Sequence, residues 1–287
     1  MDSTAAQTVS EKIEVTVEAA EEIVRHPFVK KLARFGFYTK GFLFTVIGFL
    51  AIMVAIGERG GRLADPTGAL AAVAQLPLGK ILLIIFTVGA IGHGAWNILR
   101  GAADVDNVGK GWQGIVTRIL AIGIGIFYLY LAWTALDLVL TAHVTGENGA
   151  VQKTFISILL AVPLGAFLAA IIGLGVIGAG IHECYSGITG KYKENFKVYK
   201  MEGKKRKIVS ILGYISFLAR ALILALMGYY FVSAAIFYDP QIAIGIDGAL
   251  LMLSQTFYGK TLLFVTATGL VCHGILSLYE ARYRRIC

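Results

Sequence analysis

The chain alternates long apolar segments with short polar ones, and six of the apolar segments are long enough to cross a bilayer. A hydrocarbon core of ~30 Å needs about 20 mostly apolar residues in a helix. The segments that meet this length are residues 36–57, 79–99, 115–140, 156–181, 209–237 and 259–279. The pattern therefore predicts six transmembrane helices.

The end of the second apolar segment occurs three times in the chain. Gly89–Gly101 aligns with Gly269–Ala281, 180 residues later, so that His93 matches His273. A degenerate copy, 86 residues after the first, has Ala179 in place of the histidine. Each copy holds two segments, so all three copies have the same orientation, and any symmetry axis runs along the membrane normal.

Copies one and three also match in other places. Lys40 falls on Arg220, and the Gly-Ala-Leu run at 68–70 falls on 248–250, whereas the middle copy lacks this run and has Ile124 near the Lys40 position. The prediction is an all-α integral membrane protein, a six-helix bundle of three tandem two-helix repeats. We expect these repeats to adopt a pseudo-threefold arrangement about the membrane normal.

The apolar residues near the N-terminus recur at helical spacing with glutamates around them, which predicts an acidic amphipathic helix. Such a helix either packs against the basic loop or stays solvated beside a loop that faces anionic lipid. The predicted parts of the chain are the acidic helix at 1–30, repeat one at 31–104, repeat two at 112–190, the basic loop at 191–207, and repeat three with its basic tail at 208–287.

Composition and charge place these helices in a membrane and orient them. Hydrophobic residues make up 57% of the chain, charged residues 15%, and the mean hydropathy is +0.73. The loops on one side carry 19 Lys and Arg residues, and those on the other side carry five. Positive residues stay on the cytoplasmic side, so both termini are expected in the cytoplasm. The net charge of +8 is then a topology signal, and no nucleic-acid partner is expected.

Two apolar runs, at 68–76 and 246–253, are too short to span a membrane. Each is expected to form a short helix at the outer surface, and Asp65 or Thr67 is expected to cap the first of them. Two such helices would either form a lid over the centre of the bundle or act as interface plugs without a function.

Polar side chains inside the apolar segments are the candidate functional residues. An ionisable group that faces lipid is costly, so such groups normally face an interior or water. We expect a set of them to converge at one depth: Lys40, His93, Asn97, His182, Glu183, Arg220 and His273. Two interpretations stay open. The cluster binds an anion, relays protons or holds a cofactor; or Lys40 extends to the headgroups and Glu183 neutralises Arg118 or Arg220, for structure only.

Other chemistry has little support in the sequence. His93 and His273 match in depth and have glycines beside them, so haem b held between two imidazoles is a minor alternative. The three cysteines form no CxxC or zinc-like spacing. Motifs for a nucleophile, a phosphate-binding loop or a metalloprotease are absent from the sequence, so an enzyme is not expected.

Several of these features together resemble a family of bacterial membrane proteins, the domain of unknown function 1206. The resemblance rests on the threefold two-helix unit, the Gly-Ala-Leu run, the Pro-Leu-Gly start of the second helix and the ending Tyr279–Arg285. It covers residues 32–285 and implies a six-helix, multi-pass protein of the bacterial inner membrane. The resemblance implies no established activity, so no site residues are carried over from it.

The leading hypothesis is a transporter-like or channel-like protein, or one that binds a small anionic or lipid-like ligand in its polar centre. The expected ligand-binding residues are Lys40, His93, Asn97, Glu183, Arg220 and His273. One alternative is a structural or assembly partner that docks another protein through its N-terminal helix. A second alternative is a haem b electron carrier that uses the two matched histidines.

Overall fold

The computed structural model describes residues 27–284, except 59–60, 106, 110, 142–149, 198 and 200. Regular structure in this part of the chain is helical, apart from an isolated bridge between Phe196 and Arg284. This confirms the predicted all-α class. The first 26 residues of the predicted acidic helix lie outside the described residues, so its packing against the basic loop stays a prediction.

In the part of the chain that the structure describes, six helices are long and apolar enough to cross a membrane, which makes the chain a multi-pass membrane protein. At ~1.5 Å per residue, even the shortest, with 24 residues, extends ~36 Å and exceeds a hydrocarbon core of ~30 Å. The six are α2 (Pro27–Ile56), α4 (Gly79–Ala102), α5 (Trp112–Thr141), α7 (Gly165–Thr189), α8 (Gly203–Phe237) and α10 (Gly259–Tyr283).

The observed helices agree with the predicted segments at residues 79, 237 and 259, and the fourth helix differs most at its start. Helix α2 extends from Pro27, the first described residue, to Ile56, so it begins earlier than the predicted segment 36–57 and ends within one residue of it. The predicted segment 156–181 is wrong at its start, since α7 begins only at Gly165. The helical conformation is interrupted before Gly165, because Leu164 has a φ of 62°. A left-handed residue cannot continue a right-handed helix.

Each repeat has a short helix before its second long helix: α3 (Pro66–Ala74), α6 (Ala150–Leu160) and α9 (Ile246–Ser254). The middle repeat thus has this element even though it lacks the Gly-Ala-Leu run. Asp65 caps α3, with its Oδ1 accepting from the Gly68 N–H at 2.7 Å. Leu70 and Leu250 are fully buried in the core between the long helices. The short helices α3 and α9 therefore pack one face against the long helices.

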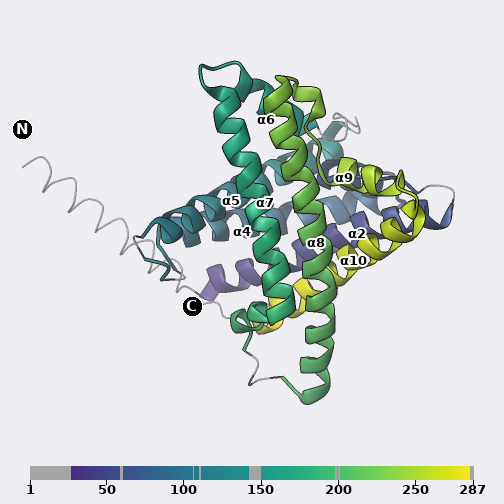
Figure 1. The fold of residues 1–287 in the computed structure, drawn as a ribbon. Helices are drawn as coiled ribbons and strands as arrows, with labels where there is room; N and C mark the ends of the chain where they lie inside the picture. The colour runs from purple at the N-terminus through teal and green to yellow at the C-terminus, as the bar shows by residue number, and fades with distance from the viewer. Residues whose placement is uncertain are drawn as a thin grey trace, which may run out of the picture.

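The long helices pack in an order that connects successive repeats. The second helix of each repeat lies along the first helix of the next, so that α4 packs on α5, α7 on α8, and α10 on α2. Figure 1 shows α7 and α8 side by side, crossing the pair formed by α2 and α10. Contacts of α2 with α4 and of α8 with α10 join the helices within repeats one and three.

The three interfaces between repeats share one close backbone contact. A Cβ atom on Gly274 would lie 2.7 Å from the Gly41 carbonyl oxygen, and one on Gly94 would lie 2.8 Å from that of Gly125. In the third interface, a Cβ on Gly180 would lie 3.0 Å from the carbonyl of Ala221. Small residues allow membrane helices to approach this closely. These contacts place the three repeats in register. The residue just before the contacting carbonyl is Lys40 in repeat one, Ile124 in repeat two and Arg220 in repeat three.

The middle repeat differs from the other two in one respect. Its helices α5 and α7 make little contact over their described residues, whereas the corresponding helices of repeats one and three pack together. The order of helices around the bundle is thus interrupted between α5 and α7. The pseudo-threefold arrangement about the membrane normal stays a prediction.

The close contact predicts which glycines tolerate a larger side chain. A valine at Gly274 would meet Thr45 Oγ1 and the Gly41 carbonyl, whereas a valine at Gly178 of α7 would meet nothing within 4 Å. We expect Gly274→Val to lower the free energy of unfolding in detergent by about 1–3 kcal/mol, the usual effect of overpacking. Gly178→Val is the control, because both changes place the same residue in a helix. Equal melting temperatures for the two variants would contradict the interface.

Candidate functional site

A cavity of about 530 Å³ lies among the long helices. This volume falls in the range of roughly 300–1,000 Å³ that is usual for small-molecule sites. Side chains from α2, α4, α5, α8 and α10 form its walls, and α3, α6 and α9 contribute at one end. We call this end the short-helix end, and we call the opposite end, which carries Arg100 and Arg284, the basic end.

The cavity brings together most of the residues that the sequence singled out. Its described lining includes Lys40, His93, Asn97, Arg220 and His273. Glu183 lies behind Arg220, with its carboxylate 3.0 Å from the guanidinium. The expectation for His182 is wrong, because its side chain is exposed on α7. Adjacent residues of a helix point in directions about 100° apart, so Glu183 turns inward and His182 does not.

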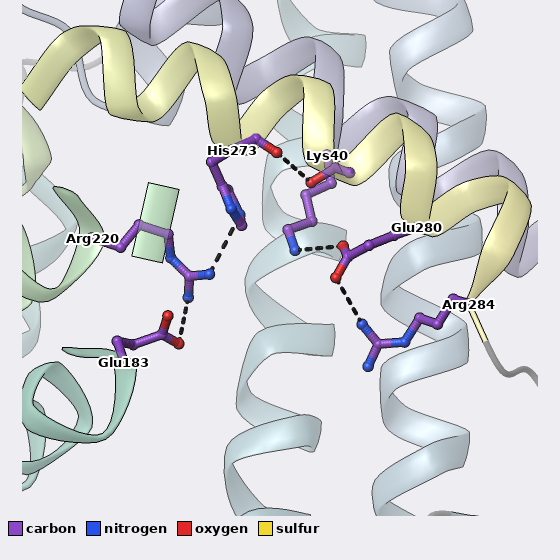
Figure 2. A network of polar contacts seen from close by, with 7 residues as sticks. Lys40, Glu183, Arg220, His273, Glu280 and Arg284 are labelled. Carbon is purple, nitrogen blue, oxygen red and sulfur yellow. Dashed lines mark hydrogen bonds and ion pairs between the residues drawn. The ribbon is translucent and has the colours of Figure 1, made fainter. Parts of the chain in front are cut away.

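One carboxylate bridges two cations at the basic end of the cavity. Glu280 Oε2 lies 3.2 Å from Lys40 Nζ, and its Oε1 lies 3.2 Å from a terminal nitrogen of Arg284. Figure 2 shows Lys40 and Arg284 on either side of this carboxylate. All three side chains are mostly buried. Because a charge buried alone is costly, the bridge allows these groups to remain in the bundle.

Arg220 forms a second polar group beside the first. One of its terminal nitrogens donates to Glu183 Oε1 at 3.0 Å, and the other lies 3.5 Å from His273 Nε2, as Figure 2 shows. Of the two partners expected for Glu183, the structure therefore selects Arg220. Arg118 instead donates to the carbonyl oxygens of Gly101 and Ala102. The second carboxylate oxygen of Glu183 is buried without a hydrogen-bond partner.

These two polar groups hold more positive than negative charge. Lys40, Arg220 and Arg284 supply three cations, and Glu183 and Glu280 supply two carboxylates, which leaves one positive charge in excess. Inside a bundle the effective dielectric is low, so an unbalanced charge interacts strongly with any ion that enters. The arrangement favours an anion over a cation at this end of the cavity.

The two matched imidazoles have matching surroundings. His273 packs edge-on against Phe44 of α2, with the ring centroids 4.7 Å apart. His93 packs in the same way against Tyr128 of α5, with the ring centroids 4.4 Å apart. Phe37 also contacts His93, at 5.2 Å. A guanidinium can only donate, so a hydrogen bond between Arg220 and His273 requires Nε2 of the imidazole to accept. Nδ1 of each histidine is buried and has no partner.

This environment does not fit axial ligation of haem b. The ring of His93 is enclosed by Phe37 and Tyr128, which occupy the space that a macrocycle beside it would need. The Nε2 atom of His273 faces a cation, and a second positive centre there would be repelled. Over the described residues, no three His, Cys, Asp or Glu side chains form a group that could hold a metal ion.

Glu280, Arg284 and Tyr128 belong to the site although the sequence analysis did not select them. The predicted sixth segment ends at residue 279, so Glu280 lies just outside it. A signal was present in the spacing, because Glu280 follows His273 by seven residues, which is two helical turns on one face. Tyr128 carried no such signal, since tyrosine is common in membrane helices.

Beyond the polar groups the cavity is apolar. Leu43 and Phe44 of α2, Ile223 of α8 and Leu270 of α10 form its middle part. The amide of Asn97 donates to the carbonyl oxygen of His93 at 2.8 Å, so this polar group is paired within its own helix. The cavity is therefore amphipathic along its length, with cations at the basic end and hydrocarbon beyond them.

The short-helix end contains a second, smaller polar group. Pro66, Gln152 and Ile246 line the cavity there. Asp247, in the first turn of α9, has a buried Oδ1 without a hydrogen-bond partner, as has the Oε1 of Gln152. Burial raises the pKa of the Asp247 carboxyl, and the nearby Asp65 raises it further.

The bridge at Glu280 predicts a coupled effect on stability. We expect Glu280→Gln to destabilise the protein by about 3 kcal/mol, because it leaves two buried cations without a counter-charge. Adding Lys40→Met to Glu280→Gln should recover part of that loss. Thermal unfolding of Glu280→Gln, Lys40→Met and the double variant in detergent tests the coupling. Additive losses in the double variant would show that Lys40 and Glu280 do not interact.

The raised pKa of Asp247 predicts a pH-dependent effect of its replacement. The folded protein favours the protonated acid, so the stability associated with Asp247 is present below the ordinary carboxyl range and is lost as pH rises through the raised pKa. Asp247→Asn should therefore raise the melting temperature at neutral pH and have a smaller effect in acid. A benefit that is equal at both pH values would contradict this assignment.

Comparison with known proteins identifies the family. The profile of the family Domain of Unknown Function (DUF1206) matches the chain three times, over residues 35–104, 120–190 and 215–284. An uncharacterized protein of Bacillus subtilis (strain 168), YxxB, is 31% identical over 260 residues, which cover 91% of this chain and 93% of that protein. No solved structure matches. The resemblance noted in the sequence is confirmed, and the chain belongs to the DUF1206 family.

Proposed function

We propose that this protein binds an amphipathic anion in its central cavity, with the anionic head at the basic end and an acyl chain along the apolar walls. One observation carries the proposal: a single cavity joins a polar group with excess positive charge to a wall of hydrocarbon side chains. A small hydrophilic anion would contact only the positively charged end of the cavity, and a neutral hydrocarbon would contact only its apolar wall.

The donors at the basic end suit a phosphate or carboxylate head. The contacts of Arg220 with Glu183 and His273 use two of the five N–H groups that a guanidinium carries. Arginine binds phosphate and carboxylate groups through paired N–H donors, and these bonds are stronger than bonds between neutral groups.

The orientation of the protein determines which side of the membrane supplies the ligand. We place the chain in the bacterial inner membrane with both termini in the cytoplasm, because the loops on that side hold most of the Lys and Arg residues. The basic end of the cavity then lies toward the cytoplasm. Release on the opposite side, as in a transporter, would require α3 and α9 to move away from the other end.

Binding of paired probes tests the proposal. Lysophosphatidate carries a phosphate and one acyl chain, lysophosphatidylcholine masks the charge on the same chain, and glycerol 3-phosphate lacks the chain. Native mass spectrometry of the full-length protein in a neutral detergent should show tight binding of the first probe alone. Lys40→Met should weaken this binding at least about tenfold, or ~1.4 kcal/mol, since it removes the excess charge.

The control for this experiment is Lys31→Met, which removes an exposed lysine from the same helix. We expect it to bind lysophosphatidate like the parent protein. Lys40→Met leaves Glu280 paired with Arg284, so this variant is expected to fold, and its melting temperature checks that expectation. Equal binding of the anionic and zwitterionic lipids would refute the proposal. Equal binding of glycerol 3-phosphate would reduce the ligand to a small soluble anion.

A further inference from the structure

We infer that the gap between α5 and α7 is a lateral portal, through which an anionic lipid of one leaflet slides into the cavity. The inference rests on the proposed function and adds to it the source of the ligand and its route of entry. Through this gap the cavity would reach the membrane side of the protein, and repeats one and three supply the cations Lys40 and Arg220 that line the cavity.

The exposure of side chains along one face of α5 locates the opening. Leu120, Ile124, Leu131 and Leu138 recur at helical spacing and share a face. Toward the basic end, Leu120 is 58% exposed and Ile124 is 44% exposed, whereas Leu131 and Leu138 are 0% and 5% exposed. This face of α5 is therefore exposed in the half of the bundle near the basic end and buried in the other half.

Ile124 also shows that the opening reaches the cavity. It lines the cavity and yet has nearly half of its surface exposed, so the inside and the outside of the bundle meet at this side chain. Residues of α7 are absent from the described lining of the cavity, although every other long helix contributes to it. The wall of the cavity therefore lacks a contribution from α7 beside Ile124.

The difference between the repeats makes this opening suitable for hydrocarbon. The shared backbone contacts place Ile124 where the other repeats have Lys40 and Arg220. At the histidine position, the middle repeat has Ala179. At these two positions, the helices that border the gap therefore have apolar side chains, and the carboxylate of Glu183, one turn beyond Ala179 on α7, is paired with Arg220. An acyl chain can pass between such helices without leaving an apolar environment.

The headgroup would find its counter-charge at the same level. Arg220 is on α8, the helix that packs against α7 next to the gap. Its side chain is 26% exposed although it is paired with Glu183. A lipid in the leaflet next to the basic end has its head toward that end and its chain toward the bilayer centre. The cavity has the same polarity, so the lipid can enter sideways without turning over.

Photocrosslinking of the full-length protein tests the route. We would place benzoylphenylalanine at Leu120, on the face of the gap, or at Ile126, which is 59% exposed but does not line the cavity. The matched exposure makes Ile126 a control for contact with bulk lipid. At Leu120, we expect an adduct with lysophosphatidate that saturates, that excess unlabelled lysophosphatidate competes away, and that Lys40→Met abolishes. At Ile126, the adduct should rise linearly with lipid and resist competition.

A second measurement separates the route from the binding itself. Ile124→Trp narrows the gap, so we expect it to slow association of lysophosphatidate at least about tenfold, with dissociation slowed in parallel. Normal binding with unchanged rates, or equal adducts at the two positions, would overturn the portal while leaving the proposed function intact. A crosslink from Leu120 to a second copy of the protein would also overturn it, because a protein helix would then fill the gap. Loss of all lysophosphatidate binding in the parent protein would refute both proposals.

Discussion

The pairing of charges inside a membrane bundle is the interaction on which the arrangement of this protein depends. Lys40 comes from α2, Glu280 from α10, Arg220 from α8 and Glu183 from α7. A charge in hydrocarbon is costly unless a partner or water reaches it, so these four helices have to meet at one level. The cavity lies beside this level, with the paired charges at its basic end and large apolar side chains along its middle part.

Three similar interfaces make that meeting possible. The Gly274 and Gly41, Gly94 and Gly125, and Gly180 and Ala221 contacts place the backbones close together at equivalent points. Lipid is as apolar as the side chains, so packing contacts of this kind, rather than the hydrophobic effect, hold membrane helices together. The same contacts place His273 against Phe44 and His93 against Tyr128. The middle repeat keeps the interface and has Ile124 and Ala179 in place of the matched cation and histidine, and its polar contribution is Glu183, which pairs with Arg220 of the third repeat.

Several members of the candidate site could be selected from the sequence because internal repetition makes them visible. Lys40 matches Arg220, and His93 matches His273, and such ionisable groups in apolar segments are rarely directed at lipid. Glu280 and Arg284 were missed because they follow the apolar segment and look like part of a solvated tail. His182 was expected to join the site because depth along a helix can be read from sequence, whereas the direction of a side chain depends on how the helix is rotated against its neighbours.

Sequence alone determined the helical class, the six spans and the threefold repetition, because hydrophobic length and internal similarity are local properties of the chain. The tertiary structure decided which cation faces which carboxylate, since the ion pair of Lys40 and Glu280 joins residues 240 positions apart. It also decided that α5 and α7 of one repeat stay apart while the other repeats close. A gap of that kind depends on how whole helices pack against each other, and no single segment of the sequence contains that information.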